Sequence, residues 1–208
     1  MNYRVKSGVK EKIILHVNNN MIFYLIAIFC LCFGMVIGIY SAKYMVGQQR
    51  EGLIEVINRN ASVLNDGSIS TLHYFLGTLK SNLQFFLVLF VLGLTVIGLP
   101  LIYLVDIYKG FTLGFAFCFV TNNFGTNGLW LSVIGLIIFN IMYIPIMLFS
   151  SVLAIENSIR IIQNGIGQGK SWFKGILSYG SYYIIIISVI IVINFMQCMV
   201  FPLLLAQV

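Results

Sequence analysis

The sequence predicts an all-α integral membrane protein with five transmembrane helices, the third of them short, a cytoplasmic N-terminus and an extracellular C-terminus. Of the 208 residues, 60% are hydrophobic and only 9% are charged, whereas a soluble domain carries about 25% charged residues. Apolar stretches recur along the whole chain, so one polytopic membrane domain is expected over residues 1–208. The net charge of +6 comes from basic residues that flank these stretches. They are therefore interpreted as topology signals and not as a nucleic-acid surface.

Each apolar segment is judged against the roughly 20 residues that a helix needs to cross a bilayer. The first segment, residues 21–42, follows a basic tail but is longer than the core of a signal peptide, so we expect an uncleaved anchor. The other four spans are expected at residues 83–105, 110–124, 129–155 and 179–206. Residues 43–82 then form an outer loop, and residues 156–178 form an inner loop.

The third segment is the doubtful crossing, because only residues 111–121 are continuously apolar. Short loops rich in Lys and Arg favour the cytoplasm. If the segment dips in and returns, five basic residues lie inside and seven outside. A full crossing places eight inside (Arg4, Lys6, Lys10, Lys12, Lys109, Arg160, Lys170 and Lys174) and four outside (Lys43, Arg50, Arg59 and Lys80). We therefore predict five full crossings.

Small residues and prolines inside the spans predict helix packing. Gly110 and Gly114 form a GxxxG pair, which lets two helix backbones approach closely. Gly34 and Gly38 form a similar pair in the first span, although such pairs also arise by chance.

Pro100, with Gly98 beside it, and Pro145 are assigned to packing as well, because a proline can kink its helix. The two prolines fall at similar depths of their predicted spans, which would also fit a transporter site between broken helices.

No catalytic, cofactor-binding or metal site is predicted, and the protein is not expected to be an enzyme. His16 and His73 fall on opposite sides of the membrane in this topology. The four cysteines lie in apolar runs without the His or acidic neighbours that a zinc site needs.

No ionisable residue is expected deep in a span, which argues against ion-coupled transport. Asp106 is placed at the inner boundary, paired locally with Lys109.

The outer loop contains one organised stretch, residues 51–64, with an apolar stripe at helical spacing. Leu53, Ile57 and Leu64 on this stripe are candidate partner-contact residues. The alternatives are packing on the protein's own helices or on the lipid surface.

One ordered set of motifs resembles a known family. The stretch VIGLPLIYLVDIYKGFTLGFAFCFVTNNFGTNGLW, followed by IMYIPIMLF, is similar to stage II sporulation protein M, an engulfment protein of endospore-forming bacteria. The resembling features are the Gly-Leu-Pro, the Lys-Gly pair, the Gly-containing third segment that ends in Asn residues, and a Pro in the fourth span. Chain length, basic N-terminal tail and five-span layout also agree.

The resemblance implies a non-enzymatic scaffold in the cell membrane, on the mother-cell side of the sporulation septum. There it would recruit the peptidoglycan hydrolases named stage II sporulation proteins P and D, so that remodelling of the cell wall allows forespore engulfment. A small permease or channel component is the alternative function. Besides lipid, these hydrolases are the expected partners, and self-association into a homo-oligomer stays open.

Overall fold

The structure is a computed structural model that describes the backbone of residues 9–65, 71–131, 139–164 and 169–205. Side chains are described for residues 14–56, 75–123, 140–163 and 175–198. Within these ranges the chain forms helices and no β-strand, which confirms the all-α fold class. The helices are α1 (Val9–Asn19), α2 (Met21–Lys43), α3 (Gly47–Asn65), α4 (Thr71–Gly93), α5 (Gly98–Leu131), α6 (Phe139–Asn164) and α7 (Gly169–Leu205).

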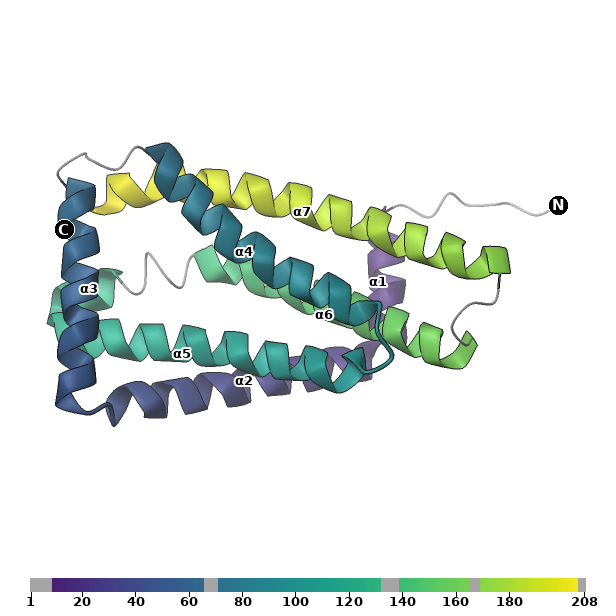
Figure 1. Cartoon of the computed structure of the whole chain (residues 1–208), viewed down its shortest axis with the longest axis horizontal. Coiled ribbons are helices and arrows are strands. Elements are labelled where there is room, and N and C mark those ends of the chain that lie inside the picture. Colours follow the sequence, from purple (N-terminus) through teal and green to yellow (C-terminus); the bar gives the residue numbers. More distant parts are fainter. Residues whose placement is uncertain (1–8, 66–70, 132–138, 165–168, 206–208) are drawn as a thin grey trace.

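Five helices are long and apolar enough to cross a membrane, as predicted. Their spanning parts are Met21–Lys43 in α2, Phe75–Gly93 in α4, Gly98–Asn123 in α5, Asn140–Gln163 in α6 and Gly175–Cys198 in α7. These helices run roughly along one common direction, so the bundle has two ends (Figure 1). We call one the α1 end, where α1 and the connection between α4 and α5 lie. At the other, the α3 end, α3 crosses the bundle nearly at a right angle (Figure 1).

The boundaries of the second and third spans differ from the expected ones. A turn at residues 94–97 divides the predicted second span, residues 83–105. The third span is not short, because 26 residues from Gly98 to Asn123 are apolar enough to cross. The break expected near Lys109 lies inside α5.

The later boundaries also shift. The predicted fourth span, residues 129–155, starts too early, because Leu131 still belongs to α5 and the spanning part of α6 begins at Asn140. The predicted last span, residues 179–206, overlaps the spanning part of α7, Gly175–Cys198.

Side chains from α6 explain why an apolar sequence turns at residues 94–97. The backbone carbonyls at the end of a helix have no partner within the helix and must find one elsewhere. Asn157 Nδ2 donates to the Gly93 carbonyl oxygen at 2.9 Å, and Ser158 Oγ donates to the Thr95 carbonyl oxygen at 2.7 Å. Thr95 Oγ1 in turn donates to the Leu92 carbonyl oxygen at 2.8 Å. The turn is thus fixed to α6 by hydrogen bonds that replace the missing helical ones.

The helices α2 and α5 form the closest pair in the bundle, and glycines make this approach possible. A Cβ atom at Gly110 or Gly114 would overlap the backbone of α2, at the carbonyl oxygens of Leu31 and Met35. The converse holds for two glycines of α2, since a Cβ at either would overlap backbone oxygens of α5. These two are Gly34, facing Ile107, and Gly38, facing Phe111. Two GxxxG pairs therefore face each other, and backbone packs on backbone.

Helix α6 occupies the centre of the bundle. In its spanning part 56% of the residues are buried, compared with at most 28% in the other four. Two clusters of buried apolar side chains surround it, one centred on Tyr183 and Ile190 of α7 and the other on Leu89 and Ile102 of α4 and α5. The exposed side chains of α2 and α7 are mostly large and apolar, as expected for helices that face lipid.

Candidate functional site

A cavity of about 480 Å³ lies between α6 and α7 near the α1 end. Its volume falls within the range of roughly 300–1,000 Å³ that is typical of ligand sites. Two helical stripes and one residue of α1 line it: Phe149, Leu153, Glu156, Asn157 and Arg160 of α6, Ser178, Tyr179, Tyr182 and Ile185 of α7, and His16. We call this cavity the α6–α7 groove.

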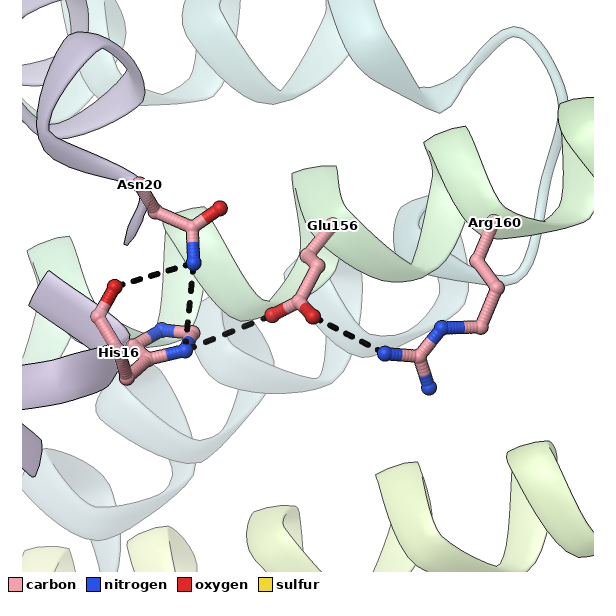
Figure 2. A network of polar contacts seen from close by, with 4 residues as sticks. All are labelled: His16, Asn20, Glu156 and Arg160. Carbon is pink, nitrogen blue, oxygen red and sulfur yellow. Dashed lines mark hydrogen bonds and ion pairs between the residues drawn. The ribbon is translucent and has the colours of Figure 1, made fainter. Parts of the chain in front are cut away.

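A polar network at the groove joins α1 to α6 (Figure 2). Glu156 is at its centre: one carboxylate oxygen lies 2.9 Å from Arg160 Nη2, and the other lies 3.5 Å from His16 Nδ1. Asn20, just after α1, donates to the His16 carbonyl oxygen at 3.0 Å. The other ring nitrogen of His16, Nε2, is buried and has no hydrogen-bond partner in the described part of the chain.

Aromatic rings hold the His16 imidazole from two sides. The ring meets Phe149 of α6 edge to face, with centroids 5.3 Å apart, and Tyr24 of α2 in the same manner at 6.1 Å. The imidazole therefore has a defined position in the wall of the groove.

A second polar feature is a carboxyl group buried inside the bundle. Asp106 of α5 is 0% exposed, and its Oδ1 accepts a hydrogen bond from Ser151 Oγ of α6 at 2.7 Å. Its Oδ2 and the neighbouring hydroxyl of Ser150 are buried without a hydrogen-bond partner in the described part of the chain. An ionisable group at such a depth is a functional candidate by default, because burial in a membrane is costly for a charge.

The position of Asp106 corrects two expectations. It lies eight residues after Gly98, about 12 Å along α5, and not at the membrane boundary. The local pair with Lys109 does not form among the described side chains, since Asp106 meets Ser151 while Lys109 Nζ lies 5.2 Å from the ring centre of Phe85. The expectation that no ionisable residue lies deep in a span is therefore wrong.

The two prolines singled out in the sequence do not occupy matching depths. Pro100 is in the first turn of α5, where a proline removes no helical hydrogen bond. Pro145 is inside α6. Gly98 begins α5, and a Cβ there would overlap the Leu92 carbonyl oxygen across the turn. The matched-proline argument for a transport site therefore fails, and Gly98 serves the tight turn.

The apolar stripe predicted in the outer loop lies on α3. Leu53 is half-buried, and the side chains of Ile57 and Leu64 lie outside the described residues. Arg50 ties α3 to the bundle, because its Nε donates to Asn123 Oδ1 of α5. Within the described residues, no three His, Cys, Asp or Glu side chains are close enough together to hold a metal ion.

Sequence reasoning missed the α6–α7 groove and the buried Asp106. The groove needs α1 folded back against α6, and nothing in the spacing of His16 and Glu156 indicates that contact. The signal for Asp106 was present, because Gly93, Gly98 and Pro100 mark a helix end and a helix start that would have placed Asp106 inside the next span.

Comparison with known proteins gives one family. No significant match to a curated protein or to a solved structure was found. The family model for stage II sporulation protein M matches residues 27–200. This stretch includes nearly all of the five spanning helices and most of the chain. The chain therefore belongs to the stage II sporulation protein M family, which indicates a sporulation-related, multi-pass membrane protein.

Proposed function

We propose that the protein is a non-enzymatic membrane scaffold on the mother-cell side of the sporulation septum. In this role it gathers peptidoglycan hydrolases, stage II sporulation proteins P and D, for forespore engulfment. The family assignment over residues 27–200 supports this proposal. Hydrolases that act on the cell wall meet a membrane partner outside the cell or within the membrane.

The observation that carries the scaffold role is the placement of α3. Among the described helices at the α3 end, α3 alone is not long and apolar enough to span a membrane. It lies across the bundle (Figure 1). Arg50 fixes its start to α5, while Glu51, Glu55 and Val56 point outward and are exposed. A helix held in this way presents a defined surface to a partner on that side.

Exchange of Leu53 and Ile57 together for Ser tests this role. Protein amount and septal location are measured first, and recruitment of fluorescently tagged hydrolases to the septum second. A stable variant that fails to recruit them supports a docking surface on α3. Leu177→Ser, at an exposed leucine of α7 near the α1 end, is the matched control and is expected to recruit normally.

Two results would count against α3. Normal recruitment by a stable double variant transfers the contact to the spanning helices. Loss of the protein itself assigns Leu53 and Ile57 to packing on the bundle.

A permease or channel component is a second candidate, and buried Asp106 is the observation that favours it. Ion-coupled transport uses an intramembrane carboxyl group of this kind. Ion or proton flux into vesicles that contain the purified protein, abolished by Asp106→Asn, would favour this second function over the scaffold.

A further inference from the structure

The α6–α7 groove lies at the boundary of the apolar part of the bundle. Asn157 in its wall donates to the Gly93 carbonyl oxygen, so the polar part of the groove is level with the turn where α4 ends and α5 begins. Both α6 and α7 continue beyond this level (Figure 1). The charged groups of the groove are thus at the depth where the headgroups of a bilayer meet its hydrocarbon.

The lining of the groove changes from charged to apolar along the helix direction. On α6, Arg160 and Glu156 lie toward the α1 end, and Phe149 lies eleven residues, about 16 Å, deeper. On α7, Ser178 lies toward the same end, and Ile185 lies about 10 Å deeper. Both walls therefore have the same order, with polar groups at the boundary and hydrocarbon below. An amphiphile with one polar end matches this order.

The charges in the groove select the kind of polar end. Glu156 and Arg160 contribute one negative and one positive group, and both remain partly exposed, at 35% and 50%. A headgroup that carries only a negative charge would be repelled by the Glu156 carboxylate. One that carries only a positive charge would be repelled by the Arg160 guanidinium. A headgroup with an ammonium and a phosphate satisfies both. The His16 imidazole lies between these charges and the apolar part of the groove, because it contacts both Glu156 and the ring of Phe149.

We propose that the α6–α7 groove binds a phospholipid with an amine-bearing zwitterionic headgroup, of which phosphatidylethanolamine is the simplest. The ammonium donates to Glu156, the phosphate accepts from Arg160, and one acyl chain follows Phe149, Leu153 and Ile185. This proposal is independent of the scaffold function, since it concerns the opposite end of the bundle from α3.

Lipid competition on the purified full-length protein tests the proposal. The protein in detergent is given equal amounts of phosphatidylethanolamine, phosphatidylglycerol and phosphatidylcholine with identical acyl chains, and the bound lipid is counted by native mass spectrometry. We expect about tenfold preference for phosphatidylethanolamine, which corresponds to one additional hydrogen bond between charged groups. Phosphatidylcholine has no N–H to donate to Glu156. Equal binding of the three lipids overturns the proposal.

Charge variants identify the groove as the site. Glu156→Gln is expected to remove the preference for phosphatidylethanolamine, and Arg160→Gln is expected to weaken binding of all three lipids. Glu55→Gln, an exposed carboxylate on α3, is the matched control and keeps the preference. A Glu156→Gln protein that retains the full preference overturns the assignment to this groove.

Two further measurements distinguish lipid binding in the groove from unfolding of a charge variant and from binding of a soluble ligand. Ser178→Trp fills the mouth of the groove without altering its charge, so it shows loss of binding even if a charge variant unfolds. Glycerophosphoethanolamine, the soluble headgroup without acyl chains, is expected to leave the melting temperature unchanged. A shift as large as the one that the lipid gives would indicate a soluble ligand and overturn the lipid assignment.

Discussion

At the residue scale, four glycines determine how closely α2 and α5 approach. Gly34, Gly38, Gly110 and Gly114 occupy positions where a Cβ atom would overlap the backbone of the facing helix. Relief of such overlaps requires movement of a whole helix, because no flexible side chain is present to shift. The spacing of each pair was visible in the sequence. That the two pairs face each other was not, because about 70 residues separate them.

Gly114→Leu is expected to destabilise the protein, because the larger side chain separates α2 from α5. Overpacking in a well-packed interior costs about 1–3 kcal/mol, and contact with backbone places this variant at the upper end. The measurements are the melting temperature in detergent and the steady-state amount in the membrane. Gly180→Leu on α7 is the control, since nothing lies within 4 Å of a Cβ there. Equal behaviour of the two variants would show that the α2–α5 contact does not depend on Gly114.

The buried Asp106 gives a second prediction at this scale. Ser151→Ala removes the hydroxyl that donates to Oδ1 at 2.7 Å, and an unsatisfied buried group costs about 1–3 kcal/mol. Asp106→Asn retains an oxygen that accepts from Ser151 and avoids burying a charge, so its stability is expected to match or exceed the wild type. Thermal unfolding of both variants checks this. A larger loss in Asp106→Asn than in Ser151→Ala would mean that the negative charge itself is required.

At the scale of elements, the turn between α4 and α5 sets the depth in the membrane of each residue of α5. Hydropathy could not locate this turn, because Leu94, Val96 and Ile97 are as apolar as the helices around them. The hydrogen bonds that hold it come from Asn157 and Ser158, more than 60 residues away. The flanking glycines and Pro100 were the local signals.

Cysteine labelling distinguishes the turn at residues 94–97 from the expected one near Lys109. In a background with all four native cysteines changed to Ser, Ile97→Cys is expected to react with a membrane-impermeant maleimide in permeabilised cells. Tyr108→Cys is expected to stay unreactive, because its surroundings are lipid. The two native side chains are similarly exposed, at 70% and 64%, so the medium around them is what differs. Reaction at Tyr108→Cys alone would support the turn near Lys109 that the sequence predicted.

At the scale of the whole molecule, the number of crossings and the helical class were predictable from the sequence. Both depend on composition and on the length of apolar stretches, which the bilayer fixes. The groove and the buried carboxyl group depend on which helices meet, and this is decided by contacts between distant residues such as His16 with Glu156. Hydropathy carries no information about such contacts.

The revised turn alters the charge count that underlies the predicted orientation. Lys109 no longer belongs to a loop, so seven basic residues lie toward the α1 end or precede it, and four lie toward the α3 end. The excess still favours a cytoplasmic α1 end. A reporter fused after Val208 is expected to be active outside the cell, and one inserted at Gly167 is expected to be active in the cytoplasm. Activity of both reporters on the same side would show that α7 does not cross the membrane.

The pairing of α2 with α5 has a consequence for the synthesis of the protein. Gly34 contacts Ile107, 73 residues later in the chain. At a translation rate of about 5–20 residues per second, α2 resides in the bilayer for roughly 4–15 s before the facing part of α5 has been made. During this interval its glycine face has no intramolecular partner and is open to the same face of another nascent chain. Correct assembly therefore depends on how promptly the later helices leave the ribosome.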